Sequence, residues 1–423
     1  MKKVGILSLG CKVNMYESEF VSNILKNAGY EICDFNDECD VYIINTCTVT
    51  NTSDIKSRKM IRKAIKNNPD ACVVAMGCFV AANKDVDIPG LDIIIGNKDK
   101  SKIVELLDEY FNKKEKIKRL YDNEIDEFED MYIDSFPGRT RAFVKIQDGC
   151  ENFCTYCIIP YVRGKCRSKE ESKVISEVKD LVKNGYKEVV LTGIHTGSYG
   201  VDLDTSFADL LEKLVQIKGL ERLRISSIET TELNEDVLNI IKNSKIIVDH
   251  LHIPIQAGSD EVLKLMNRKY NLEFFFNKIA EIRSIRPEIS ISTDLIVGFP
   301  GETDELFEHT IDTVKKLKFT KIHVFPYSER EGTKSMELPN HLSNEIKKAR
   351  ARKMLEVSRE LEINYMKKYL GKEVEVLVEE YKDGVSLGHT GNFLHVKVPK
   401  KLPHNELIKV TIKEINYPYC IGE

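Results

Sequence analysis

The stretch Cys150-Glu151-Asn152-Phe153-Cys154-Thr155-Tyr156-Cys157, here called the cluster loop, holds three cysteines with the spacing C-x3-C-x2-C. It follows the apolar run 142–147, which predicts a buried strand, so the thiols fall at the carboxyl end of that strand. Three thiolates in one loop can bind three irons of a [4Fe–4S] cluster and leave the fourth iron open to a ligand. A structural zinc site is the weaker interpretation, because zinc needs a fourth ligand and none lies nearby in the sequence.

Strands and helices alternate on both sides of the cluster loop. Six short apolar runs, most of them followed by a helical pattern, predict parallel strands joined by right-handed crossovers. We therefore expect a central α/β domain over residues 139–369, built as a (βα)6 partial barrel, with a complete eight-stranded barrel as the alternative. The expected strands are 142–147, 188–192, 222–226, 250–254, 289–297 and 321–326.

The amino-terminal segment repeats this alternation in a smaller unit. It predicts a parallel α/β sheet of the Rossmann or flavodoxin type over residues 1–112. The next stretch, 113–138, is basic and then acidic, and few of its residues could pack, so we expect a charged linker. The expected strands of the first sheet are 4–8, 41–45, 71–75 and 91–95.

The carboxyl end changes from a helical period to a strand period. A long helical pattern over 343–369 begins at Ser343 and stops before Gly371. Short runs with a period of two then surround Gly and Asn turns. This pattern predicts a small all-β barrel over residues 370–423.

Composition limits the possible classes of function. The 423 residues carry a net charge of -4, which excludes a uniformly basic nucleic-acid-binding coat but allows a local basic face. No apolar run reaches the roughly 18 residues of a membrane helix, and the apolar stretch at 4–9 is too short for a signal peptide. We therefore expect a cytoplasmic protein without membrane contact. Its eleven cysteines are an odd number, so they cannot all pair internally, and in a reducing compartment thiols serve as metal ligands or catalysts.

Cys11, Cys47 and Cys78, here called the dispersed triad, each follow a predicted strand of the first sheet. The carboxyl ends of parallel strands meet at one edge of a sheet, where ligand sites form. The three thiols could therefore converge on a second cluster. Three ordinary buried cysteines are the alternative, because buried cysteine is common.

The cluster loop, with the aromatic Tyr156 before its last cysteine, resembles the radical S-adenosylmethionine (SAM) enzymes. Further segments narrow the resemblance to the methylthiotransferase family and extend it over essentially the whole chain. Within that family the segment 193–200, Gly-Ile-His-Thr-Gly-Ser-Tyr-Gly, is similar to the MtaB subgroup, which modifies N6-threonylcarbamoyladenosine in tRNA. The narrowing segments are 45–49, 77–78, 149–164, 254–259 and 293–303.

This resemblance implies two [4Fe–4S] clusters and SAM as cofactors. The three cysteines of the cluster loop would bind the radical SAM cluster, and the dispersed triad would bind an auxiliary cluster that carries the sulfur to be inserted. Reductive cleavage of SAM would give a 5′-deoxyadenosyl radical that removes the hydrogen from C2 of the adenine, and a second SAM would supply the methyl group.

The resemblance also implies partners: the anticodon stem-loop of tRNA and a cellular electron donor such as flavodoxin or ferredoxin. The carboxyl-terminal module would be a TRAM RNA-binding domain. Runs of basic residues could neutralise phosphates, although such runs also solvate the outer face of any helix. The candidates are Lys56, Arg58, Lys59, Arg62, Lys63, Lys66, Arg163, Lys165, Arg167, Lys169, Lys347, Lys348, Arg350, Arg352, Lys353, Lys397, Lys400 and Lys401.

Residues for SAM itself are expected on the edge that carries the cluster loop. We expect Tyr156, Glu229 and Gln256 to contact SAM, although polar side chains there could equally cap loops. Gly298 would let a nucleoside approach closely, or serve a turn, as would Gly301. Many radical SAM enzymes have a Glu in the loop after the second strand. This chain has none in the loop 193–196, where His195 is a possible substitute or simply a solvated side chain.

Three other functions compete with the threonylcarbamoyl reaction. Two are methylthiolation of isopentenyladenosine in tRNA and of an aspartate in a ribosomal protein; the third is an iron–sulfur electron carrier with an RNA-binding tail. The segment 193–200 favours the threonylcarbamoyl substrate, because its glycines, His195, Thr196 and Ser198 offer room and hydrogen bonds. Two large α/β domains exceed what an electron carrier needs.

Overall fold

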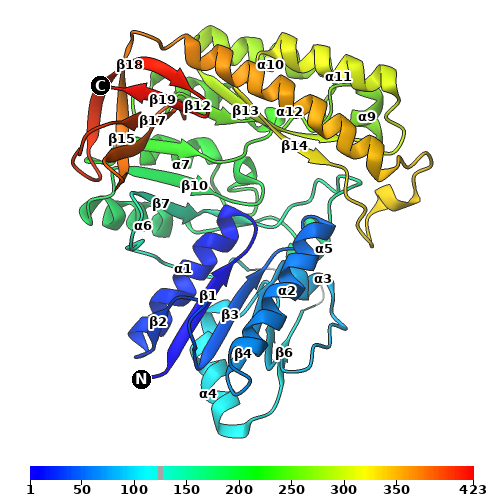
Figure 1. Cartoon of the computed structure of the whole chain (residues 1–423), viewed down its shortest axis with the longest axis vertical. Coiled ribbons are helices and arrows are strands. Elements are labelled where there is room, and N and C mark those ends of the chain that lie inside the picture. Colours follow the sequence, from blue (N-terminus) through cyan, green and yellow to red (C-terminus); the bar gives the residue numbers. More distant parts are fainter. Residues whose placement is uncertain (122–126) are drawn as a thin grey trace.

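The computed structural model describes residues 1–121 and 127–423. Figure 1 shows two lobes: the amino-terminal sheet forms one, and the central domain forms the other together with the carboxyl-terminal barrel. Within the described part of the chain, no helix combines the length and the apolar character needed to cross a membrane.

The first lobe is a six-stranded parallel sheet with the order β2-β1-β3-β4-β5-β6. Its central strands are buried on both faces, which explains their continuous apolar sequence. The four expected strands are present, but β2 and β6 were not expected, because three-residue edge strands give no readable period. The strands are β1 (Lys3–Ser8), β2 (Glu31–Cys33), β3 (Val41–Thr46), β4 (Cys72–Gly77), β5 (Ile93–Ile95) and β6 (Ile117–Arg119); the helices are α1 (Lys12–Asn27), α2 (Asn51–Asn67), α3 (Cys78–Ala82) and α4 (Ile103–Lys113).

The charged stretch 113–138 packs more than its composition predicts. Its strand β6 pairs with β5, and Met131, Ile133 and Phe136 are buried in the core. Few residues here were expected to pack, and these apolar side chains are buried nonetheless. Isolated apolar residues inside a charged run produce no periodic signal, yet Met131, Ile133 and Phe136 cover a neighbouring surface. The domain boundaries themselves remain a prediction.

The central domain consists of two three-stranded parallel sheets, β7-β10-β11 and β12-β13-β14, linked by single bridges such as Ser227 to His252. The six expected strands form, and in the described residues they make an open, partial barrel rather than a closed eight-stranded one. The strands are β7 (Arg141–Lys145), β10 (Glu188–Thr192), β11 (Arg222–Ile225), β12 (His250–His252), β13 (Ser290–Val297) and β14 (Lys321–Pro326).

Helices cover the outside of this partial barrel (Figure 1). The long helix α12 lies along β14, where the Ser358 hydroxyl accepts a hydrogen bond from the Ile322 N–H at 3.0 Å. A short hairpin flanks the cluster loop on both sides. The helices are α5 (Ile159–Arg163), α6 (Glu171–Lys183), α7 (Phe207–Leu214), α8 (Glu235–Asn243), α9 (Asp260–Leu265), α10 (Leu272–Ile285), α11 (Asp304–Leu317) and α12 (Asn344–Lys367), and the hairpin strands are β8 (Gln147–Asp148) and β9 (Arg167–Ser168).

The carboxyl-terminal strands close into a five-stranded barrel with the order β15-β16-β17-β19-β18. Alternate residues of β17 point into its core, as the period of two predicts. Salt bridges attach the barrel to the central domain: Arg141 pairs with Glu379 at 2.8 Å and Arg222 with Glu375 at 3.0 Å. Its strands are β15 (Glu373–Lys382), β16 (Val385–Thr390), β17 (His395–Val398), β18 (Leu407–Asn416) and β19 (Tyr419–Gly422).

Candidate active site

The cluster loop forms a compact turn directly after β8. Gly149 begins it with φ 78°, and a Cβ there would lie 1.8 Å from the Lys165 carbonyl oxygen, so only glycine fits. The Cys157 N–H donates to the Cys154 carbonyl oxygen at 3.0 Å. Cys154 is buried, whereas Cys150 and Cys157 are half-buried. The backbone therefore gathers the three thiols in one recess at the carboxyl end of the barrel strands.

The dispersed triad lies at the carboxyl edge of the first sheet. Cys11 precedes α1, Cys47 follows β3 and Cys78 begins α3. A Cβ on Gly10 would lie 2.7 Å from the Cys47 sulfur, so the chain before Cys11 touches Cys47. Burial and the neighbouring Cys78 both raise the pKa of Cys47. Desolvation, with a contribution from Cys78, raises the pKa of Cys11 to about 11. The structure thus brings these three cysteines together, which is one of the two arrangements that the strand positions allowed.

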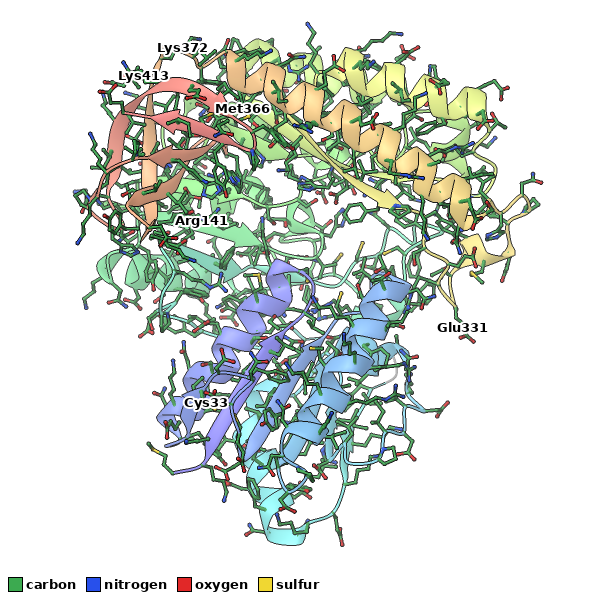
Figure 2. The ribbon with its side chains drawn as sticks, in the orientation of Figure 1. Cys33, Arg141, Glu331, Met366, Lys372 and Lys413 are labelled. Carbon is green, nitrogen blue, oxygen red and sulfur yellow. The ribbon has the colours of Figure 1, made fainter. Side chains whose placement is uncertain are left out.

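The two cysteine groups face each other across the junction of the lobes. Burial raises the pKa of Cys157 to about 12, and Cys78 of the opposite group contributes to this rise. Cys78 also packs with Ile158 and Val162, which follow the cluster loop. Cys33, by contrast, lies in the amino-terminal lobe away from this junction (Figure 2), with its sulfur 2.6 Å from that of Cys39. These two cysteines belong to neither group.

Each cysteine group receives a hydrogen bond from one buried arginine. Arg163 Nε donates to the Cys78 sulfur at 3.2 Å, and Arg268 Nη1 donates to the Cys154 sulfur at 3.3 Å. Neither contact was predictable from a local sequence pattern, because each joins residues far apart in the chain. Positive donors aimed at sulfur favour thiolate over thiol and suit the negative ligands of an iron–sulfur cluster.

A buried ion network holds Arg163 in place. Its guanidinium lies 2.9 Å from Asp148 and 3.1 Å from Glu17, and all three side chains are at most 4% exposed. Glu17 also pairs with Lys100 at 2.5 Å and with Lys145 at 2.9 Å. Because Glu17 and Lys100 come from the first lobe while the others belong to the central domain, the network joins the two lobes beneath the cysteines.

Comparison with known proteins agrees with this arrangement. Residues 144–314 match the radical SAM superfamily, and residues 3–96 match the Uncharacterized protein family UPF0004. A Bacillus subtilis protein named threonylcarbamoyladenosine tRNA methylthiotransferase MtaB is 41% identical over 100% of this chain and 96% of its own length. The chain belongs to the radical SAM methylthiotransferase family. It is therefore a radical SAM enzyme, a class that uses SAM and a [4Fe–4S] cluster.

Other relatives extend the comparison to a second substrate name and to solved structures. An Aquifex aeolicus protein that is also named MtaB is 37% identical over 97% of this chain and 100% of its own length. A Carboxydothermus hydrogenoformans protein named tRNA-2-methylthio-N(6)-dimethylallyladenosine synthase is 36% identical over 89% of this chain and 88% of its own. The radical SAM methyltransferase TsrM from Kitasatospora setae has a TM-score of 0.57 at 14% identity, covering 77% of this chain and 73% of its own, which shows a shared fold.

Two expected SAM contacts lie beside the cluster loop. Glu229 forms an ion pair with Arg268, the same arginine that donates to Cys154, and these three residues border one small cavity. The Tyr156 ring packs edge-on against Phe299 at 6.4 Å between centroids. Both positions are compatible with SAM binding, which remains a prediction for them.

The other expected SAM contacts have local structural reasons. Gln256 adopts φ 63° and joins β13 through its backbone, with its carbonyl oxygen accepting from the Ile296 N–H at 2.8 Å. Gly298 adopts φ 74°, and a Cβ there would lie 2.7 Å from the Lys347 side chain of α12. A Cβ on Gly301 would lie 3.0 Å from Leu265. Close packing is therefore sufficient to explain both glycines.

The polar side chains of the segment 193–200 already have hydrogen-bond partners within the protein. His195 lies 2.7 Å from Glu232 and 2.7 Å from the Ser198 hydroxyl, and the Thr196 hydroxyl lies 3.1 Å from that of Ser226. Although burial opposes it, hydrogen bonds to Cys166 and Glu232 raise the pKa of His195 to about 10. The polar groups that the sequence offered to a substrate are therefore already engaged with the protein.

Several residues of the expected RNA footprint are not accessible. Arg163, Arg167 and Lys169, which follow the cluster loop, are at most 2% exposed. On α12, Lys347 pairs with Glu329 and Arg350 with Glu302, and both cations are buried. These five residues bind the protein itself, so the expectation that they contact RNA is wrong. The basic residues of α2 other than Arg58 remain exposed.

Proposed function

We propose that this protein adds a methylthio group to C2 of N6-threonylcarbamoyladenosine at position 37 of tRNA. The observation that carries the proposal is the relationship to the Bacillus subtilis MtaB protein, at 41% identity over the full chain. The relatives named for dimethylallyladenosine are 36–38% identical over 88–89% of the chain, and they make that nucleoside the second candidate.

The three cysteines of the cluster loop would hold the radical SAM cluster. When bound, the cluster and SAM supply a 5′-deoxyadenosyl radical that removes the C2 hydrogen of the adenine. Arg268 would stabilise the Cys154 thiolate. Glu229, which is held in place by Arg268, would offer its remaining hydrogen-bond acceptor sites to SAM. Tyr156, Gln256 and Gly298 would complete the walls around SAM.

The dispersed triad would hold the second [4Fe–4S] cluster. The triad faces the cluster loop, so a base held between the two would reach both, and Arg163 would fix the Cys78 thiolate. Burial at the junction would keep water away from the reacting carbon. A small electron-transfer protein of the flavodoxin or ferredoxin type would reduce the enzyme.

The RNA would be held by shape and by backbone contacts, with the target base unpaired in the anticodon loop. The carboxyl-terminal barrel, as a TRAM module, and the exposed basic face of α2 would make these contacts. Binding should therefore weaken as salt increases.

The test presents purified, reconstituted enzyme with three substrates under anaerobic, reducing conditions. These are the threonylcarbamoylated anticodon arm, the isopentenylated arm and a ribosomal protein that carries the candidate aspartate. Mass spectrometry should detect the methylthio product from the first substrate. Product from either of the other two, with none from the first, would refute the proposal.

A further inference from the structure

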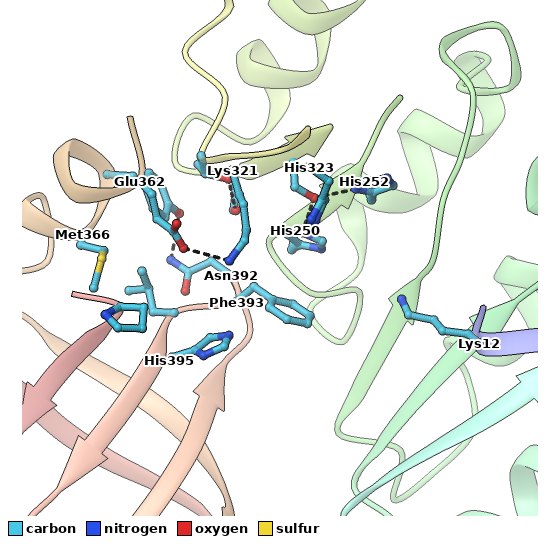
Figure 3. Close-up of a pocket in the computed structure, with 16 residues that line it drawn as sticks. Lys12, His250, His252, Lys321, His323, Glu362, Met366, Asn392, Phe393 and His395 are labelled. Atoms are coloured by element: carbon cyan, nitrogen blue, oxygen red, sulfur yellow. Dashed lines mark hydrogen bonds and ion pairs between the residues drawn. The ribbon is translucent and has the colours of Figure 1, made fainter. Parts of the chain in front are cut away.

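A cavity of about 370 Å³ lies between the inner face of the partial barrel and the carboxyl-terminal barrel. Its walls come from β12, β13, β14 and α12, from the loop between β16 and β17, and from Lys12 of the first lobe. Figure 3 shows Lys12 reaching toward this cavity from its separate helix. Lys12 directly follows Cys11, so this side chain connects the cavity wall to the dispersed triad.

Arg224 on β11 lies behind one wall of this cavity and has an unused hydrogen-bonding fork. Its Nε donates to Glu188 at 2.8 Å, but neither Nη1 nor Nη2 has a hydrogen-bond partner among the residues that the structure describes. The side chain is 1% exposed. Phe393, which lines the cavity, stacks on the guanidinium at 4.4 Å. Stacking uses the face of the guanidinium and leaves its N–H edge free for a planar anion.

Two further groups converge on the same place. The Nδ1 atom of buried His250 has no hydrogen-bond partner within the described ranges, and its ring lies 4.9 Å from that of Phe393. Lys12 lines the cavity and forms no ion pair with any described residue. Unfilled buried donors are costly, and a positive side chain in the same cavity wall favours an anion there.

The carboxylates around the cavity are already paired. Glu188 is paired with Arg224, Glu362 with Lys321 at 3.2 Å, and Asp294 with His252 at 3.3 Å. His323 lies close to the last pair. Among the described residues, the unused polar atoms here are both Nη atoms of Arg224, His250 Nδ1 and one oxygen of Glu188. The excess of cationic donors suits a ligand that combines a carboxylate with hydroxyl and urea groups.

We propose that this cavity is the subsite for the threonyl group of the substrate base, with Arg224 and Lys12 binding its carboxylate and His250 binding its hydroxyl or urea. The inference rests on the proposed function and deepens it. It also replaces the segment 193–200 as the specificity element, because the polar side chains of that segment are engaged with the protein. An isopentenyl group would leave the Arg224 fork unfilled.

The test compares two anticodon arms that differ in one group. The first carries threonylcarbamoyl at position 37, and the second carries the same group with its carboxylate converted to a primary amide. Reconstituted wild-type enzyme should bind the acid arm at least about tenfold more tightly than the amide arm, as expected for hydrogen bonds to a charged group. Fluorescence anisotropy measures both affinities.

Point variants test which residues cause this difference in affinity between the two arms. Arg224→Gln should remove most of the preference for the acid arm while changing the affinity for the amide arm less than about twofold, and Lys12→Gln should reduce the preference in the same way. Arg224→Lys keeps the charge but loses the fork, so it should give an intermediate preference. Lys242→Gln, which removes an exposed charge from α8, should leave the preference unchanged. Iron content and circular dichroism confirm that each variant is folded.

Two results would overturn the subsite. One is an unchanged acid preference in Arg224→Gln and Lys12→Gln; the other is an equal loss for both arms, which would indicate contact with a backbone phosphate instead. The reaction of the wild-type enzyme shows whether the subsite or the proposed function is wrong. Methylthiolation of the acid arm, together with equal binding of both arms, would reject the subsite alone. Methylthiolation of the isopentenylated arm only would reject the function itself.

Discussion

Replacing Arg163 with methionine should destabilise the junction between the two lobes. Methionine keeps most of the volume but removes every donor of the guanidinium. The substitution leaves Asp148, which accepts at 2.9 Å, and Glu17, which accepts at 3.1 Å, buried with fewer cationic partners. Removing one member of a buried ion network costs about 3–5 kcal/mol. The Lys145 and Lys100 contacts to Glu17 persist, so the value should lie nearer 3.

Urea unfolding of cluster-free protein at neutral pH, followed by circular dichroism, measures this cost without interference from iron. Arg163→Lys retains the charge but loses the fork, so it should cost about 1–3 kcal/mol. Arg352→Met is the matched control, because Arg352 is exposed on α12, and it should change stability by less than about 0.5 kcal/mol. A free energy for Arg163→Met equal to that of the control would show that the network is not a structural tie and would refute the reasoning.

Three further predictions concern the clusters and pH. Reconstituted protein should contain about eight irons, and about four after alanine replaces all three cysteines of the cluster loop. If iron analysis finds only about four in the wild type, the prediction of a second cluster is wrong. Cys154→Ala should abolish cleavage of SAM. Cys47→Ala should still release 5′-deoxyadenosine, measured by chromatography, but should form no methylthio product. If the Cys47→Ala enzyme does form that product, the inserted sulfur does not come from the dispersed triad's cluster. Against the effect of burial, Arg163 and the neighbouring lysines hold the pKa of Glu17 well below its ordinary value of 4.5, and Arg163 and Lys145 likewise lower the pKa of Asp148. Both carboxylates therefore contribute stability that is present at neutral pH and lost as pH falls below about 4.5. As the pH is lowered below about 4.5, the urea midpoint should fall less steeply in Glu17→Gln than in the wild type.

The positions of the six candidate cluster cysteines were readable from the sequence. The spacing of the cluster loop is local, and its place after a strand follows from one apolar run. The members of the dispersed triad are far apart in the chain, but parallel strands place their carboxyl ends on one edge, so strand position alone placed Cys11, Cys47 and Cys78 where they could meet. The central partial barrel was likewise predictable, because alternating strands and helices have few allowed connections.

Side-chain partners were decided only by the tertiary structure. Glu17 meets Lys145 across 128 residues, and Arg268 meets Cys154 across 114. A local charge pattern cannot tell a solvated arginine from a buried one, which is why Arg163 looked like an RNA contact. The cavity beside Arg224 was likewise not predictable from the sequence, because its walls come from both lobes and from the barrel loop at Phe393. Periodicity in a sequence reports which face of an element is buried, whereas the identity of what covers that face is set by the packing of distant elements.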